Sequence, residues 1–203
     1  MKRVPVVPTI LVALAVAAMI GLGLWQLLDR LPQKEAFLAQ LAANPSRPAI
    51  AMPAPAIGDD LLFRRASATC LSPISFSTEG AGNAGYRVIA HCSTGAEGPG
   101  FAVQIGTTRD VDFKPDWRGG PVSGLISHAP SHEPLIAGLF GKTAPKPLLL
   151  VADTPVPGLT ANAVPSIESI PNNHLAYAVQ WFAFATIALV IYGLALRRRA
   201  QRG

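Results

Sequence analysis

The chain has 203 residues, half of them hydrophobic, and a formal net charge of +5. This hydrophobic share is high for a soluble domain, and the excess lies in two uncharged runs near the ends, Thr9–Leu28 and Ala176–Leu196. As helices, both runs are long enough to cross a bilayer core of about 30 Å. The composition therefore predicts a membrane protein with one spanning helix at each end.

The basic residues mark the two ends of the chain. Of the 17 Lys and Arg, two precede the first run and four follow the second, which leaves eleven against 12 acidic residues in the middle. A nucleic-acid partner is excluded, because it would need basic residues clustered on a domain. The positive-inside tendency places both tails in the cytoplasm and the middle domain on the far side.

The first run starts like a secretory signal, with Lys2 and Arg3 ahead of it. It continues into Trp25-Gln26-Leu27-Leu28 without a small-residue cleavage site, so we expect an uncleaved anchor. No Arg- and Ser-rich presequence is visible, which favours a bacterial inner membrane over a mitochondrial one.

Small residues recur every four positions in the first run, at Ala13, Ala17 and Gly21. Such a stripe lets two helices approach closely, so either it packs against the second run or it belongs to an ordinary Ala-rich span. Farther on, Pro32 is expected to kink the chain. The pattern of Gln33–Asn44 then indicates a short helix.

The middle of the chain changes to short β-like runs between Gly and Pro breakers. The candidate strands are Tyr86–Cys92, Phe101–Ile105, Val122–Ser127 and Leu148–Ala152. Several short strands at this spacing predict a small, mainly antiparallel β domain, built as a barrel or a sandwich.

These patterns divide the chain into seven parts. They are a cytoplasmic tail (1–8), a transmembrane helix (9–28), a short helix with a Pro-rich linker (29–58), a periplasmic β domain (59–153), a return linker (154–173), a second transmembrane helix (174–196) and a basic cytoplasmic tail (197–203).

The two cysteines, Cys70 and Cys92, are equidistant from Ala81 in Gly80-Ala81-Gly82. A hairpin centred on Ala81 would place them opposite each other. In an oxidising periplasm they would then be able to form a disulfide, which we expect to contribute about 3 kcal/mol. Two free thiols are the alternative.

Two motifs suggest other chemistry. Gly80–Gly85 fits G-x-G-x-x-G, but a strand-like segment follows it instead of a helix, which favours a hairpin turn over a dinucleotide site. His128 and His132 lie four residues apart beside Glu133, but Pro130 between them opposes a shared helical face, so the metal-site signal is weak.

Catalysis finds little support. The chain has no G-x-S-x-G nucleophile motif. Its closely spaced acids are expected to be solvated loop charges: Asp110, Asp112 and Asp116. We therefore do not expect an enzyme.

Aromatic and polar residues open the second run. Asn172 and Asn173 are good N-cap residues, which puts His174 in the first turn of the helix. His174, Tyr177 and Trp181 then share one face. This face either ligates haem iron through His174, or it is an interfacial belt of the kind that Trp, Tyr and His commonly form.

A second group closes the first run on the same side of the membrane: Trp25, Gln26 and Arg30. Polar residues at this level are a functional hypothesis by default. An imidazole is able to ligate haem iron, aromatic rings stack on a macrocycle, and Arg30 or Lys34 would pair with propionates.

These residues carry a family resemblance. Gly23-Leu24-Trp25-Gln26, with Arg30 and Lys34, resembles the L-G-x-W-Q-x-x-R-x-x-x-K signature at the first span of the Surfeit-locus cytochrome c oxidase assembly factors. Asn173-His174-Leu175, with Tyr177 and Gln180-Trp181-Phe182, resembles the second-span signature of that family. The middle diverges: Gln104-Ile105-Gly106-Thr107 stands where the family commonly has an Asn-Arg-Gly-Trp-like segment.

The resemblance implies a non-catalytic assembly factor. Family members assist insertion of haem into subunit I of haem-copper oxidases, and the bacterial members are taken to bind haem a. The proposed ligand of the family, the histidine of the second span, corresponds to His174. The expected partners are cytochrome c oxidase subunit I, other oxidase assembly factors and membrane lipid.

Two hypotheses follow from the resemblance and the residues together. In the first, haem a binds transiently at His174. Its walls would be Trp25, Tyr177 and Trp181, and its polar groups would meet Gln26, Arg30 or Gln180. In the second, the protein is a cofactor-free membrane scaffold that holds an oxidase assembly intermediate through its β domain.

Overall fold

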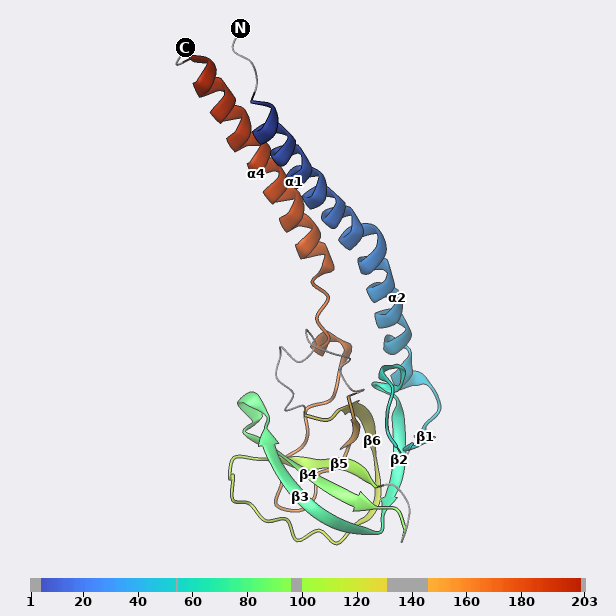
Figure 1. Ribbon diagram of the computed structural model, residues 1–203. Helices are drawn as coiled ribbons and strands as arrows, with labels where there is room; N and C mark the ends of the chain where they lie inside the picture. The colour runs from blue at the N-terminus through green and yellow to red at the C-terminus, as the bar shows by residue number, and fades with distance from the viewer. Residues whose placement is uncertain (1–4, 54, 96–99, 131–145, 202–203) are drawn as a thin grey trace. The chain divides into compact units, whose positions relative to one another are not determined.

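The computed structural model describes residues 5–53, 55–95, 100–130 and 146–201 (Figure 1). They form two compact units, a helical unit from within 1–38 and 170–203 and a β unit from within 39–169. The predicted architecture, two long apolar terminal helices flanking a mainly antiparallel β domain, is confirmed.

The helical unit pairs α1 (Val6–Trp25) with α4 (His174–Gln201), which lie side by side (Figure 1). After α1 the chain continues helically through a π-helical turn, η1 (Gln26–Arg30), into α2 (Leu31–Ala42). The large apolar side chains of α1 and α4 are mostly exposed, and both helices are long and apolar enough to cross a membrane. Apolar faces without a protein partner are typical of helices in lipid.

The contact face of the helix pair has a spacing of alternately three and four residues. In α1 its less exposed positions are Thr9, Val12, Val16, Met19 and Gly23. In α4 the same spacing is followed by His174, Ala178, Trp181, Ala185, Ala188 and Tyr192, and Phe182 and Leu196 are also less exposed. This spacing keeps a seam on one side of a helix, as in coiled coils.

The stripe of small residues does not lie on this seam. Ala13 and Ala17 are exposed, and a Cβ built on Gly21 would meet no atom within 4 Å. A strict four-residue step advances about 40° per repeat around a helix of 3.6 residues per turn, so it drifts away from a partner. Of the two alternatives, packing of the stripe against the second span is therefore wrong, and the stripe belongs to an ordinary Ala-rich span.

Pro32 does not end the helix. The chain stays helical from Leu31 to Ala42, two residues earlier at each end than predicted. A proline inside a helix clashes with the carbonyl four residues before it, here that of Leu28, and wider turns relieve such crowding. The π turn Gln26–Arg30 contains Leu28, which accounts for its position.

The β unit is one seven-stranded sheet in the order β1-β2-β6-β7-β5-β4-β3. Its strands are β1 (Ile50–Ala51), β2 (Arg65–Cys70), β3 (Ser72–Gly80), β4 (Tyr86–Ser93), β5 (Phe101–Thr108), β6 (Gly120–His128) and β7 (Leu148–Ala152). The pairs β1–β2 and β5–β7 are parallel and the others antiparallel. The four predicted strands are confirmed as β4, β5, β6 and β7. Short 3₁₀ turns complete the unit: η2 (Asn44–Ser46), η3 (Asp59–Leu61), η4 (Gly82–Ala84) and η5 (Ile167–Ser169).

Both faces of the central strands are buried. One row of register partners contains Ala90, Val103, Leu150 and Ile126, and the next contains Ile89, Gln104, Val151 and Leu125. Because every residue of β7 is buried, this strand is a continuous apolar run with no alternation.

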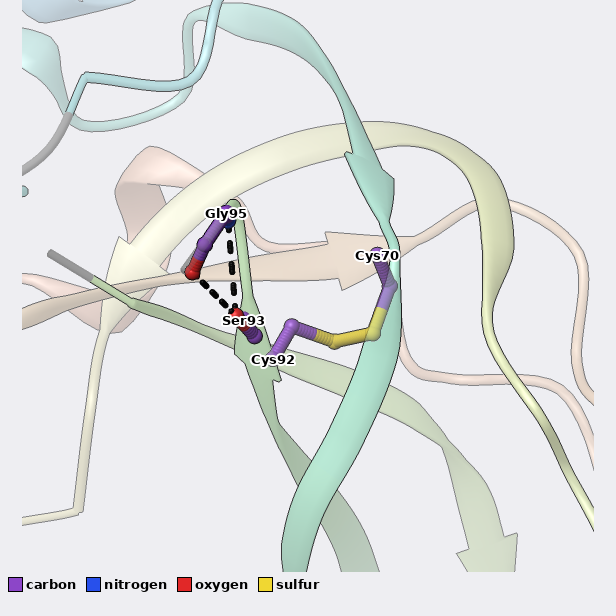
Figure 2. The surroundings of a disulfide bond; sticks show 4 residues. All are labelled: Cys70, Cys92, Ser93 and Gly95. Atoms are coloured by element: carbon purple, nitrogen blue, oxygen red, sulfur yellow. Dashed lines mark hydrogen bonds between the residues drawn. A yellow bond between two sulfur atoms is a disulfide. The ribbon is translucent and has the colours of Figure 1, made fainter. Parts of the chain in front are cut away.

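The sheet must curl to bring β2 and β3 together. These strands are separated by Leu71 alone in the sequence, but they stand second and last in the strand order. A disulfide between Cys70, at the end of β2, and Cys92, in β4, lies at this junction (Figure 2). Leu71 N–H also donates to Ser93 O at 3.1 Å. The disulfide therefore links the end of β2 to β4, which lies next to the far edge strand of the sheet.

The hairpin behind the cysteine prediction is centred elsewhere. Gly80 pairs with Tyr86, so β3 and β4 turn around residue 83 and not around Ala81. Cys92 consequently pairs with Pro73, and a bulge shifts the register there. The cysteines meet because the sheet curls, and not because they face each other across one hairpin. The turn interpretation of Gly80–Gly85 is confirmed, since Ala81 N–H donates to Gly85 O.

The segment Gln104–Thr107 of β5, where the sequence diverges from the family pattern, forms hydrogen bonds to the residues that follow β7. The backbones of Thr107 and Thr160 bond each other in both directions, and the side-chain amide of Gln104 donates to Asn162 Oδ1 at 2.8 Å. Between them Gly106 has φ 152°, and a Cβ there would lie 2.6 Å from Leu159 Cβ. This close approach accepts only glycine.

Candidate functional site

His174 is the first residue of α4, as predicted. Tyr177 N–H donates to Asn173 O at 3.0 Å, so Asn173 accepts the first hydrogen bond of the helix as an N-cap residue does. The start of α4 places the imidazole on the seam of the helix pair, where it is partly buried.

Gln26 is the hydrogen-bond partner of His174. Its side-chain oxygen Oε1 lies 2.7 Å from His174 Nδ1. We expected Gln26 to meet the polar groups of a bound macrocycle. The structure places it against the imidazole, so the two predicted site residues form a hydrogen-bonded pair.

Trp25 and Arg30 form a second pair across the π turn. The guanidinium carbon of Arg30 lies 5.4 Å from the centroid of the Trp25 ring, within the range of a cation–π contact. Trp25 is 47% exposed. In α2, Lys34 lies over Phe37 in the same way, at 5.7 Å. Both cations thus rest on aromatic faces of their own helix.

Three candidate residues of α4 are distributed around the helix. Tyr177 and Gln180 are exposed, whereas Trp181 is partly buried on the seam. The Trp181 ring meets Phe184 edge to face, with centroids 6.2 Å apart. The structure therefore brings His174 together with Gln26 and Trp25 together with Arg30. The exposed rings of Tyr177 and Trp25 fit the interfacial-belt interpretation.

Sequence reasoning missed the contact that allows the helices to approach at the site. A Cβ on Gly23 would lie 2.8 Å from the Phe182 ring, so Gly23 makes room for this ring one turn before Gln26. The signal was present, because Gly23 begins the quoted first-span motif. It was assigned no role there.

A second polar pair fixes the other end of the helices. Thr9 Oγ1 and Tyr192 Oη are hydrogen-bonded. Gln26 follows Thr9 by 17 residues and His174 precedes Tyr192 by 18, as antiparallel helices require. At 1.5 Å per residue the pairs are about 26 Å apart, close to the thickness of a bilayer core.

The weaker metal-site signal around His128 finds no support in the described residues. His128 Nε2 lies 2.9 Å from Asp59 Oδ1 in a partly exposed hydrogen-bonded contact, and His132 and Glu133 lie outside the described residues. Within the described part of the chain, no group of three His, Cys, Asp or Glu side chains is placed to hold a metal. Asp110, Asp112 and Asp116 are exposed, as expected.

The donor set at the helix pair fits one axial ligand of a haem. The contact with Gln26 uses Nδ1 of His174, and Nε2 has no hydrogen-bond partner among the residues that the structure describes. A neutral imidazole binds metals through a free ring nitrogen. Trp25 precedes Gln26 directly and offers aromatic surface at this level, and Trp181 offers it about two helical turns farther along α4. Arg30 offers a cation for carboxylates.

A model of the SURF1 family matches residues 13–186. The chain belongs to the SURF1 family. Membership implies a role as a cytochrome oxidase assembly factor, in a family known for assembly factors and not for enzymes. The match includes both α1, from Ala13 onward, and the start of α4, so the His174–Gln26 pair lies inside the family region. No match was found among curated proteins.

Proposed function

We propose that this SURF1 family chain holds haem a transiently and passes it to subunit I of cytochrome c oxidase during assembly. The observation that carries the proposal is the hydrogen bond between His174 and Gln26 at one end of a membrane helix pair. The pair is partly buried, and polar groups between apolar membrane helices are costly, so its presence there supports a functional role.

In this proposal His174 Nε2 is the iron ligand. The aromatic faces of Trp25 and Trp181 would contact the macrocycle, and the Arg30 guanidinium would pair with a propionate. Tyr177 and Gln180 remain predicted contacts at the exposed edge. Haem a is cargo here, and its redox chemistry belongs to the oxidase that receives it. The residues of this chain bind it, orient it and limit its contact with water.

The test is an absorption spectrum of the full chain, purified in mild detergent from cells that make haem a. We expect a haem band in the native protein and its loss in His174→Ala. His128→Ala is the matched control, because His128 lies in the β unit and pairs with Asp59. A native protein without haem, from cells shown to contain haem a, would contradict the proposal, and so would a full band in His174→Ala.

We also propose that the termini are cytoplasmic and the β unit periplasmic, in a bacterial inner membrane. The basic residues of both tails support this topology, and so does the disulfide, since disulfides persist in oxidising compartments. Alkaline phosphatase folds only in an oxidising compartment. It should be active when inserted in the exposed 110–116 loop and inactive when fused after residue 203. The reverse pattern would overturn the topology.

The second candidate function is a scaffold without a cofactor. It is favoured by the edge strand β3, which exposes Ile74 and Phe76 beside the exposed Leu71. Exposed apolar edge strands are surfaces that other chains pair with. Ile74→Ser with Phe76→Ser should abolish oxidase assembly if this function is the right one, and His174→Ala should leave assembly intact.

A further inference from the structure

Gln26, the hydrogen-bond partner of His174, is the subject of a further inference. Among the described residues, two side-chain hydrogen bonds join α4 to the first helix, Thr9–Tyr192 and Gln26–His174. The second of these involves an imidazole, which is the commonest metal ligand among side chains. This contact suggests a role for Gln26 beyond joining the two helices.

The backbone of the π turn leaves the Gln26 side chain free for this contact. Gln26 N–H donates to the carbonyls of Leu22 and Gly23, and Gln26 O accepts from Leu31 N–H. Its main-chain groups are thus satisfied within the helix. π turns are frequent at functional sites, and here the turn begins at the residue that meets His174.

The atom that Gln26 presents decides which imidazole nitrogen carries the proton. An amide oxygen only accepts, so in the neutral imidazole His174 Nδ1 carries the hydrogen and Nε2 keeps its lone pair. If the amide presented its NH₂ group, Nδ1 would have to accept, and the proton would sit on Nε2 and block metal binding there. The contact at 2.7 Å is made by Oε1.

We propose that Gln26 is a positioning residue, whose side-chain oxygen holds the proton on His174 Nδ1 and directs Nε2 to the iron of the haem. The inference rests on the proposed function and adds a residue to it. Such outer partners of a metal-binding histidine fix its tautomer and ring orientation and raise its basicity.

The experiment compares three full-length variants loaded with haem a in detergent. Gln26→Leu removes the acceptor, and haem affinity should fall by about 10- to 100-fold. Gln26→Glu keeps an acceptor that cannot donate, so affinity should be retained. Gln40→Leu is the matched control, because Gln40 is an exposed glutamine of α2.

Resonance Raman spectra supply a readout that a merely structural role would not move. The iron–histidine stretch of the ferrous complex should shift to higher frequency in Gln26→Glu, because a carboxylate makes the imidazole a stronger donor to iron. Circular dichroism checks the helix content of each variant. If Gln26→Leu loses helix content, its haem affinity is set aside. The iron–histidine stretching frequency of Gln26→Glu then tests the positioning role by itself.

The outcomes separate the two claims. Native affinity in Gln26→Leu, or an unshifted band in Gln26→Glu, would overturn the positioning role while His174 ligation stands. A native chain that takes up no haem a would overturn the proposed function and this inference with it.

Discussion

The helical unit and the β unit use their polar side chains in different ways. In the β unit the buried side chains of Asn44 and Thr107 donate to backbone carbonyls. The buried Gln104 donates to Asn162, whose amide in turn donates to backbone carbonyls. In the helical unit Gln26 and His174 bond each other. Side chains that satisfy backbone groups support a fold, whereas a side-chain pair among apolar helices needs another explanation. This difference is the basis of our proposal that function resides in the helices and stability in the sheet.

The largest effect should come from removing the disulfide. Cys70→Ser with Cys92→Ser opens a loop with a sequence separation of 22, which should lower the free energy of unfolding of the β unit by about 3 kcal/mol. Urea unfolding followed by fluorescence of Trp117, the tryptophan of the β unit, measures this loss. Haem binding by the helical unit should stay at the native level. An unchanged urea midpoint, or lost haem binding, would break the division of roles.

The helix pair should respond to Gly23 and not to Gly21. In Gly23→Leu the new side chain meets the Phe182 ring, whereas Gly21 faces open space. Overpacking of this kind costs about 1–3 kcal/mol. Pulsed EPR between spin labels at Leu11 and Leu189, both exposed, should show a longer or broader distance in Gly23→Leu than in Gly21→Leu. Equal distance distributions in the two variants would show that Gly23 does not determine the distance between α1 and α4.

Within the β unit, Asn162→Ala tests the attachment of the chain after β7. Asn162 accepts from Gln104 Nε2 and donates to Gln104 O and Ala152 O. Unpaired buried groups should lower the free energy of unfolding by about 1–3 kcal/mol. Asn83→Ala, at the exposed hairpin turn, is the control in the same urea experiment. The same loss in both variants would remove the argument for this attachment.

The smallest effect concerns Glu168, an exposed carboxylate of η5. A hydrogen bond from the Ser166 side chain, followed by one from its own backbone N–H, lowers the pKa of Glu168. A lowered folded-state pKa contributes stability above the unfolded pKa, and this is lost as the pH falls through the folded pKa. Carboxyl-carbon NMR should therefore show the pKa rising in Ser166→Ala. An unmoved pKa would contradict the assignment of its main cause.

The sequence predicted the parts of the fold that depend on uniform patterns. The two apolar runs, the start of α4 at His174 and the strands β4 to β7 follow from hydrophobic length, capping residues and β-like texture. Strands β1, β2 and β3 were missed, and the short β1 lies inside the predicted Pro-rich linker. β2 (Arg65–Cys70) consists mainly of small residues, and β3 (Ser72–Gly80) contains Pro73 and several serines, so neither has a strong apolar pattern.

Geometry that depends on long-range packing was harder to infer. The curl that joins Cys70 to Cys92 depends on the strand order, which local pattern does not contain. Likewise, the residue types placed Gln26 and His174 at one level, but did not predict that a π turn begins at Gln26 or that the two side chains bond directly. A Pro in an apolar helix predicts an irregularity, but not which side chain the irregularity redirects.

The most direct test of the account is the haem a content of subunit I in membranes from cells whose only copy of this protein is His174→Ala. Pyridine haemochrome spectra give haem a, and quantitative immunoblots give subunit I. If function resides in the helix pair, haem a per subunit I should fall strongly while the variant protein itself remains present in the membrane. A native ratio would contradict the account and would move the function to the surface of the β unit.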